Sequence, residues 1–313
     1  MRSLKFNIRN FFRKYIIRKQ KIGLALGSGG AKGISHIGVL EVLEKNQLVP
    51  DEISGCSIGA IIGALYASGV SLRTIKQIAL KINFISSIEL FDLTFPKDGG
   101  IVKGHIVEDF LNSILPVKRF EELKIPFTCV ATDLIKGKQV VFKKGELIPA
   151  IRASISIPGF FIPYQYNDDL LIDGSVLNPV PVDLLTDSDY RIAVVLDEYT
   201  LLKEILKKKV YFETKINKLL KESIFPKLRS LPIGKSKRIH KKAGTIDILS
   251  ATFDLINQEL LHFDLNELEA DLIIKPDVKS IPTLAFYMGR KSYREGVKAA
   301  KSVVSLIKNK ITK

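Results

Sequence analysis

Cysteine is scarce in this chain, and long apolar runs are missing from it. Its 313 residues include two cysteines, Cys56 and Cys129, which are too few for a disulfide framework and have no metal-ligand neighbours in the sequence. We therefore expect a reducing, cytoplasmic compartment and no metal site. No apolar stretch reaches the roughly 18 to 20 residues that a membrane-spanning helix needs, so the sequence does not predict an integral membrane protein.

Basic residues outnumber acidic ones, and the excess lies in two segments. The net charge is +15; residues 1–21 contain eight Lys/Arg and no acidic residue, and residues 200–245 contain fourteen Lys/Arg and three Glu. The rest of the chain is slightly acidic. Such basic segments attract surfaces that carry phosphate, which are nucleic acids or anionic lipids.

The N-terminal residues 1–20 have the pattern of a basic amphipathic helix. Leu4, Ile8 and Phe11 follow the spacing of one helical face, and Arg and Lys occupy most of the other. This pattern favours contact with an anionic membrane, so we expect a protein peripheral to the inner face of the membrane. Packing against the protein's own core and organellar targeting remain alternatives. Residues 200–245 are interpreted as a Lys-rich surface excursion or lid.

Residues 21–199 show the alternating pattern of an α/β catalytic core. Short apolar runs alternate with helical stretches, which predicts a three-layer α/β/α fold around a mainly parallel sheet. Residues 246–313 are expected to complete this core with helices and one strand. The strands are expected at residues 22–26, 51–56, 127–132, 139–142, 170–172, 192–196 and 272–275, and the helices at 31–45, 58–68 and from 292 onward.

The strongest local signal is Gly55-Cys56-Ser57-Ile58-Gly59, a G-x-S-x-G pattern between a predicted strand and a predicted helix. A nucleophile elbow needs this context, because its turn is so sharp that the residues beside the serine must lack bulk. Ser57 would then stand above the sheet edge, where the helix dipole and free N–H groups favour developing negative charge. Ser57 is therefore the candidate nucleophile.

A second glycine-rich segment, residues 27–33, also joins a predicted strand to a predicted helix. Its glycines allow the backbone to approach a ligand closely, and consecutive N–H groups can form an anion-binding site. One interpretation is a dinucleotide loop, with Asp51 or Glu52 as the acid that binds the ribose. The other is an oxyanion hole. The second interpretation also accounts for the serine elbow, so we favour it.

A serine nucleophile needs a proton acceptor. The chain has four histidines, and the order Ser, Asp, His of an α/β-hydrolase would require His240 or His262. Neither follows a predicted strand. By contrast, the apolar run 170–172 ends in Asp173 and Gly174, so that a carboxylate stands at the end of a strand before a flexible turn. Asp173 is therefore the candidate base.

Together these motifs resemble those of the patatin-like phospholipases. The resemblance rests on the glycine segment from Gly29 to Gly33, the pattern around Ser57, and the pair Asp173-Gly174, in this order and spacing. It covers about residues 21–185. The sequence departs from the family pattern at Ser28, where glycine is frequent, and at Ser175, where alanine or glycine is usual. The stretches that look most like the small bacterial members are GLALGSGGAKGISHIGVLEVL, IPFTCVATDL, the run from Arg152 to Pro158, and DGSVLNPVPVDLL.

The resemblance implies a Ser–Asp dyad that works without histidine, metal or cofactor. Asp173 would accept the proton of Ser57 as the serine attacks an ester carbonyl, and would later activate the water that releases the fatty acid from an acyl-enzyme. Partial desolvation of Asp173 would raise its pKa toward neutrality, which suits a base. The resemblance also assigns an oxyanion loop at Gly29, Gly30, Lys32 and Gly33, elbow glycines at Gly55 and Gly59, and a base motif at Gly174 and Ser175.

The expected function is therefore that of a lipid acyl hydrolase of the phospholipase A, lysophospholipase or esterase type, which makes the protein a serine carboxylic ester hydrolase. Its partners would be a phospholipid or other lipid ester, and an anionic membrane surface contacted through residues 1–20 and 200–245; no nucleic acid is expected. Two alternatives remain. One is a nucleotide-binding oxidoreductase that uses the glycine loop, and the other is a non-catalytic module that binds membrane or nucleic acid through the basic segments.

Overall fold

The computed structural model describes residues 20–82, 100–196, 252 and 268–311. Several predictions lie outside these ranges: the amphipathic helix apart from residue 20, the Lys-rich segment 200–245, and the histidines His240 and His262. Within the described residues, none of the helices combines the length and the apolar character needed to cross a membrane.

Parallel strands form the centre of one sheet, in the order β3-β2-β1-β7-β8. The first three are buried along their whole length, as expected for strands covered on both faces. All five were predicted from their apolar runs, with small differences at the ends. Their bounds are β1 Ile22–Leu26, β2 Glu52–Cys56, β3 Phe127–Asp133, β7 Tyr190–Val194 and β8 Leu272–Ile274.

Antiparallel strands extend the sheet beside β3. These are β4 (Lys138–Phe142), β5 (Tyr164–Tyr166) and β6 (Asp169–Asp173). Strand β4 occupies one edge of β3, and β2 and β6 share the other edge, one after the other. The sequence did not predict β5, because three partly exposed residues carry too little apolar pattern.

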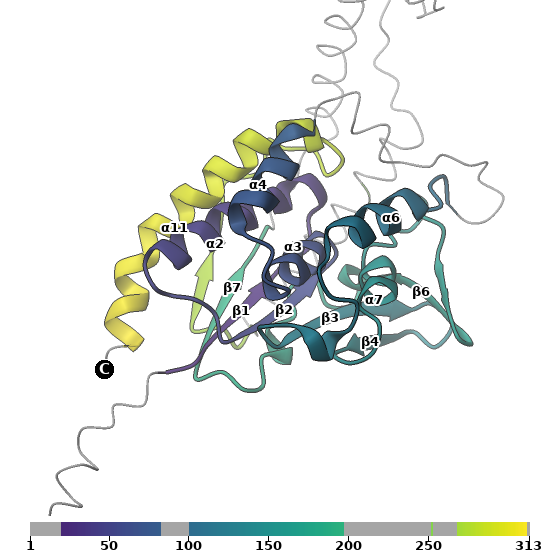
Figure 1. Cartoon of the computed structure of the whole chain (residues 1–313), viewed down its shortest axis with the longest axis horizontal. Helices are drawn as coiled ribbons and strands as arrows, with labels where there is room; N and C mark the ends of the chain where they lie inside the picture. The colour runs from purple at the N-terminus through teal and green to yellow at the C-terminus, as the bar shows by residue number, and fades with distance from the viewer. Residues whose placement is uncertain (1–19, 83–99, 197–251, 253–267, 312–313) are drawn as a thin grey trace, which may run out of the picture.

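The described α-helices pack against one face of the sheet (Figure 1). The helix predicted at 31–45 is divided into a 3₁₀ helix, η1 (Gly30–Ile34), and α2 (Ser35–Lys45). The long C-terminal helix α11 (Gly289–Ile311) lies along α2. The remaining helices are α3 (Ile58–Ala67), α4 (Leu72–Lys81), α6 (His105–Ile114), α7 (Leu147–Ser154) and the 3₁₀ helices η3 (Phe120–Glu122) and η6 (Phe286–Met288).

The opposite face of the sheet is covered by the segment that follows β6. This segment contains two 3₁₀ helices, η4 (Gly174–Val176) and η5 (Val182–Leu184). Val182 packs with Ala25 and Ala193 of the sheet in a second, smaller apolar cluster, and the hydroxyl of Ser54 donates a 2.6 Å hydrogen bond to the carbonyl of Pro181. The protein is thus a three-layer α/β/α fold with a mainly parallel sheet, as the sequence predicted.

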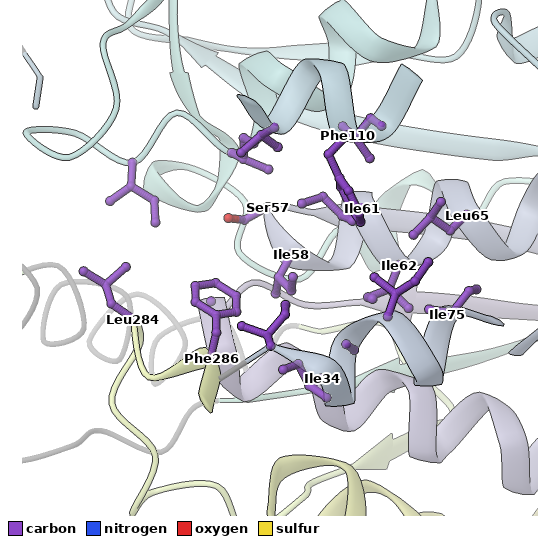
Figure 2. Close-up of a pocket in the computed structure, with 18 of the residues that line it drawn as sticks. Ile34, Ser57, Ile58, Ile61, Ile62, Leu65, Ile75, Phe110, Leu284 and Phe286 are labelled. Carbon is purple, nitrogen blue, oxygen red and sulfur yellow. The ribbon is translucent and has the colours of Figure 1, made fainter. Parts of the chain in front are cut away.

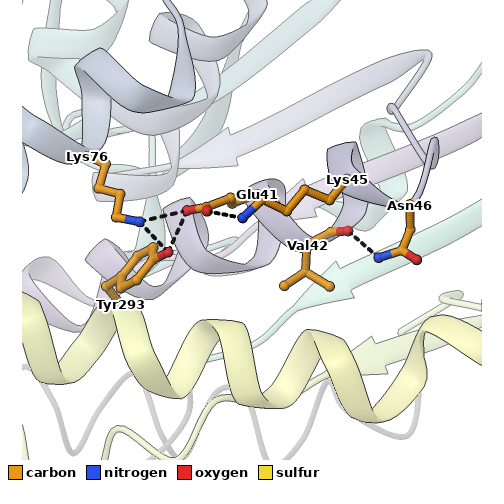
Figure 3. A network of polar contacts seen from close by, with 6 residues as sticks. All are labelled: Glu41, Val42, Lys45, Asn46, Lys76 and Tyr293. Atoms are coloured by element: carbon orange, nitrogen blue, oxygen red, sulfur yellow. Dashed lines mark hydrogen bonds and ion pairs between the residues drawn. The ribbon is translucent and has the colours of Figure 1, made fainter.

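A polar network ties three helices of the first face together (Figure 3). Glu41 of α2 accepts hydrogen bonds from Lys76 of α4 at 3.0 Å and from Tyr293 of α11 at 2.5 Å. Lys45 also donates to Glu41, and the ammonium group of Lys76 lies 4.1 Å from the centre of the Tyr293 ring. These contacts link segments that are far apart in the sequence, and they leave the Glu41 side chain 18% exposed.

Candidate active site

Ser57 lies in a sharp turn between β2 and α3. Its backbone angles are φ 54° and ψ −120°, a conformation that costs energy for a residue with a side chain. A Cβ atom at Gly55 would lie 2.6 Å from the carbonyl oxygen of Gly59, and one at Gly59 would lie 2.0 Å from that of Leu26. Both positions therefore require glycine, for the steric reason that the G-x-S-x-G pattern indicated.

The shared edge of β3 brings Asp173 to Ser57. On this edge β2 ends with Cys56 opposite Val130, and the antiparallel β6 ends with Asp173 opposite the next residue, Ala131. The two strands therefore meet end to end, although their ends are 117 residues apart in the chain. The Ser57 hydroxyl donates a 2.6 Å hydrogen bond to Oδ2 of Asp173.

The second oxygen of Asp173 is held by neutral donors. Oδ1 accepts hydrogen bonds from the backbone N–H of Ser175 at 2.9 Å and from its hydroxyl at 2.6 Å. The thiol of Cys56 lies 3.9 Å from the same oxygen. Complete burial raises the pKa of Asp173 from 3.8 to about 6, even though the hydrogen bonds from Ser175 and Ser57 oppose the shift. This is the environment of a carboxylate that accepts a proton near neutral pH.

The C-terminal end of α7 holds both members of the pair in place. The backbone N–H of Ser57 donates to the hydroxyl of Ser154 at 3.0 Å, and the backbone N–H of Asp173 donates to the carbonyl of Ser156 at 2.9 Å. Arg152, which is buried, donates to the Ser156 hydroxyl at 2.7 Å. The sequence indicates no catalytic role for this run, which carries only a resemblance to a family motif. The sequence carries no signal for these contacts, because the burial of Arg152 and the partners of the two serines depend on the fold.

The glycine loop lies beside Ser57 and leaves backbone donors available. Gly30 lines the same pocket as Ser57, and a Cβ atom there would lie 2.3 Å from the carbonyl oxygen of Thr283. The N–H of Lys32 donates to the carbonyl of Gly29, and the N–H of Ala31 donates to that of Thr283. In the part of the chain that the structure describes, the N–H groups of Gly29 and Gly30 have no acceptor.

The other loop residues have packing contacts. A Cβ atom at Gly33 would lie 2.2 Å from the Ile58 side chain, so this glycine lets the loop approach α3. The Lys32 side chain is buried, and its carbonyl accepts hydrogen bonds from Ser35 and Ser292. The oxyanion assignment therefore rests on Gly29 and Gly30 more than on Lys32 and Gly33.

An apolar pocket of about 180 Å³ opens beside Ser57 (Figure 2). Ile58, Ile61, Ile62 and Leu65 of α3 line one wall. Residues of η1, α4, α6 and the segment after α7 line the others, and Leu284 and Phe286 lie on the side of Ser57 away from Leu65. Among the described residues that line the pocket, only Ser57 has a polar side chain. Such a pocket fits a hydrocarbon chain attached to the group that reacts with Ser57.

The described histidines take no part in the pair. His36 is buried, its Nε2 lies 2.8 Å from the carbonyl oxygen of Gly27, and burial lowers its pKa to about 4. His105 is exposed and pairs with Glu108. Within the described ranges, no three His, Cys, Asp or Glu side chains are grouped closely enough to hold a metal ion; the expected absence of a metal stays a prediction.

The dinucleotide interpretation has little support from the position of its acidic residues. Asp51 and Glu52 lie at the start of β2, whereas the glycine loop follows the end of the parallel strand β1. Asp51 and Glu52 therefore lie at the opposite end of the parallel strands from the glycine loop. The carboxylate of Asp51 accepts the N–H of Ile22, and that of Glu52 accepts the hydroxyl of Ser188.

Comparison with known proteins identifies relatives of this chain. An uncharacterized NTE family protein of Mycobacterium tuberculosis is 38% identical over 179 residues, which are 56% of this chain and 49% of that protein. Lysophospholipase NTE1 of Cryptococcus neoformans is 35% identical over 187 residues, which are 57% of this chain and 11% of that protein. The chain thus spans about half the length of the first relative and about a tenth of the second.

A solved structure and a family model are also similar to this chain. VipD from Legionella pneumophila has a TM-score of 0.49 and 12% sequence identity, over 92% of this chain and 67% of that one. The family model described as patatin-like phospholipase matches residues 24–186. This match spans more than half of the chain and includes the glycine loop, Ser57 and Asp173, so the chain belongs to the patatin-like phospholipase family.

Proposed function

We propose that this protein hydrolyses a carboxylic ester of a lipid, with Ser57 as nucleophile and Asp173 as base. The observation that carries the proposal is the 2.6 Å hydrogen bond from the Ser57 hydroxyl to a buried carboxylate, next to an apolar pocket. Membership of the family supports it, as does the printed name of one relative, a lysophospholipase. The substrate class is therefore a phospholipid, a lysophospholipid or a simpler lipid ester.

In the first half of the reaction, the Ser57 oxygen attacks the ester carbonyl carbon while its proton passes to Oδ2 of Asp173. Negative charge develops on the carbonyl oxygen, and we assign its stabilisation to the N–H groups of Gly29 and Gly30, which have no acceptor among the described contacts. The carbon–oxygen bond to the alcohol then breaks. The alcohol leaves with the proton held by Asp173, and the acyl group stays on Ser57.

In the second half, water takes the place of the alcohol. Asp173 accepts a proton from the water as its oxygen attacks the acyl carbon, and the bond to Ser57 breaks. Ser57 recovers its proton from Asp173, and the fatty acid leaves. The same carboxylate thus serves as base and then acid in each half, and no redox partner or metal enters the balance.

The membrane-surface part of the proposal follows from the pocket and the sequence. An apolar pocket can accept an acyl chain only after the chain leaves the bilayer, so a position at the lipid surface shortens its path. The basic segments 1–20 and 200–245 remain the predicted contacts. Deleting residues 1–20 should reduce sedimentation with anionic vesicles and leave hydrolysis of a soluble ester unchanged. Unchanged sedimentation would show that residues 1–20 do not bind the membrane.

The nucleophile is tested by covalent trapping. A fluorophosphonate should label the wild-type protein at Ser57, as identified by mass spectrometry of its peptides, and Ser57→Ala should lose both labelling and esterase activity. Ser68→Ala is the matched control, because Ser68 is a buried serine at the other end of α3 whose hydroxyl bonds only to the carbonyl of Leu65 among the described contacts. Labelling of another residue, or full activity of Ser57→Ala, would reject the proposal.

A further inference from the structure

The pocket has an axis that begins at the nucleophile. Along α3, the lining residues Ile58, Ile61, Ile62 and Leu65 follow Ser57 at the spacing of one helical face. A helix rises about 1.5 Å per residue, so the stripe from Ser57 to Leu65 is about 12 Å long. Figure 2 shows these side chains in sequence, with Leu65 on the side of Ile61 away from Ser57.

Two well-packed side chains lie at the distant end of this stripe. Leu65 of α3 and Ile75 of α4 line the pocket there (Figure 2), and they are 3% and 2% exposed. Both belong to the main apolar core. Because such side chains are held by close packing, lengthening the pocket beyond them requires moving core residues.

We propose that this stripe measures the acyl chain of the substrate, and that Leu65 and Ile75 set the longest chain that fits in extended form. The proposal rests on the proposed function, since the acyl carbon must lie at Ser57. It adds a substrate class: esters of medium-length fatty acids.

The length follows from elementary geometry. With carbon–carbon bonds near 1.5 Å, an extended alkyl chain advances about 1.3 Å per carbon, so about nine carbons occupy the stripe. Each methylene moved from water into the apolar pocket contributes enough to raise kcat/KM about fourfold. Carbons beyond the end of the stripe contribute nothing, or they force the chain to bend against packed side chains.

The test is a chain-length profile of kcat/KM. A series of p-nitrophenyl esters from butyrate to palmitate, measured in a constant excess of nonionic detergent, should show a steep rise to octanoate or decanoate. Longer esters should then level off or decline. A continuous rise to palmitate, or equal rates throughout, would overturn the proposal.

Two substitutions should move this profile in opposite directions. Leu65→Ala removes three carbons at the distant end and should move the optimum by about two carbons toward longer chains. Ile61→Phe, at a partly exposed position midway along the stripe, should move it toward shorter chains. The profile is a ratio within one protein preparation, so a reduced fraction of folded enzyme does not change its shape.

Leu43→Ala is the matched control. Leu43 of α2 is fully buried and does not line the pocket, so its truncation should destabilise the protein and leave the profile in place. A profile that stays fixed in both Leu65→Ala and Ile61→Phe, while Ser57 is still labelled by the fluorophosphonate, would refute the measuring role and keep the proposed function. Absence of hydrolysis for every ester, together with no labelling of Ser57, would refute both.

Discussion

Two carboxylates of this protein, Asp173 and Glu41, have opposite environments. Asp173 is fully buried and accepts hydrogen bonds from neutral donors, and its pKa is raised to about 6. Glu41 is partly buried, which by itself would raise its pKa, but Lys45, Tyr293 and Lys76 lower it to about 2. The pKa values differ because Glu41 has cationic partners and access to solvent, whereas Asp173 has neither. The same functional group is thus suited to proton transfer at one site and to joining helices at the other.

The largest expected difference concerns activity. Asp173→Asn removes the proposed proton acceptor and should lower kcat by about a thousandfold or more. Glu41→Gln should keep activity within about threefold, since Glu41 is not among the residues that line the pocket. Initial rates on a chromogenic short-chain ester measure both. Asp183→Asn, at an exposed carboxylate, controls for the substitution itself. Comparable losses of kcat in the Asp173 and Glu41 variants would show that Asp173 has no special role in the reaction.

Asp173→Asn should stabilise the protein, although it lowers activity. The folded-state pKa of Asp173 lies above its ordinary value of 3.8, so its ionisation destabilises the fold as pH rises from about 4 to about 6, by about 3 kcal/mol at neutral pH. Asp173→Asn should therefore raise the free energy of unfolding at neutral pH, as measured by denaturant titration. A lower free energy of unfolding would mean that the carboxylate is stabilised by its surroundings.

The pH profile of kcat/KM reports the base directly. Activity should fall as pH decreases through about 6, because protonated Asp173 cannot accept the Ser57 proton. Ser175→Ala removes the hydroxyl bonded to the ionised carboxylate, and should raise the pKa further and move the acidic limb upward by about one pH unit. Cys56 is the other titratable group in contact with Asp173, so Cys56→Ser is measured in parallel. If Ser175→Ala leaves the acidic limb in place, the Ser175 hydroxyl does not affect the pKa of the base.

The smallest expected effect concerns the Glu41 network. Glu41→Gln should lower the free energy of unfolding by about 1 kcal/mol, because solvent screens its partly exposed ion pairs. The pKa of Glu41 is depressed from 4.5 to about 2, so its contribution is complete above pH 4.5 and is lost as pH falls through about 2. Urea titrations at several pH values measure this difference between wild type and variant. Equal stabilities at neutral pH would show that Gln replaces the carboxylate.

Parts of the fold with a strong local pattern could be predicted from sequence. The apolar run 22–26 became β1 with the same bounds, and the nucleophile turn formed where the glycines around Ser57 indicated it. The predicted helix 31–45 is an α-helix only from Ser35, since the residues before it form the 3₁₀ helix η1 (Gly30–Ile34). Helices α4, α6 and α7 were not predicted, although α4 and α6 are amphipathic and carried a usable signal.

Parts of the site that depend on distant contacts could not be predicted. Ser154 holds the backbone of Ser57 from α7, and Ser156 holds the backbone of Asp173 from the residues after α7. Serine residues are common on protein surfaces, and their spacing alone does not indicate which backbone group they will bond to. The pocket could not be predicted either. Leu65 and Ile75 are ordinary core residues in sequence, and they line a pocket only when α3 packs against α4.

The sequence by itself determined the local geometry of the nucleophile, because only glycine fits at positions 55 and 59 when the chain turns as sharply as it does at Ser57. The tertiary structure decided that Asp173 is the partner of Ser57. Two strands meet end to end on one edge of β3, and that register depends on sheet pairing among segments far apart in the chain. It also decided the pKa of Asp173, because burial is a property of the assembled fold and no local sequence specifies it.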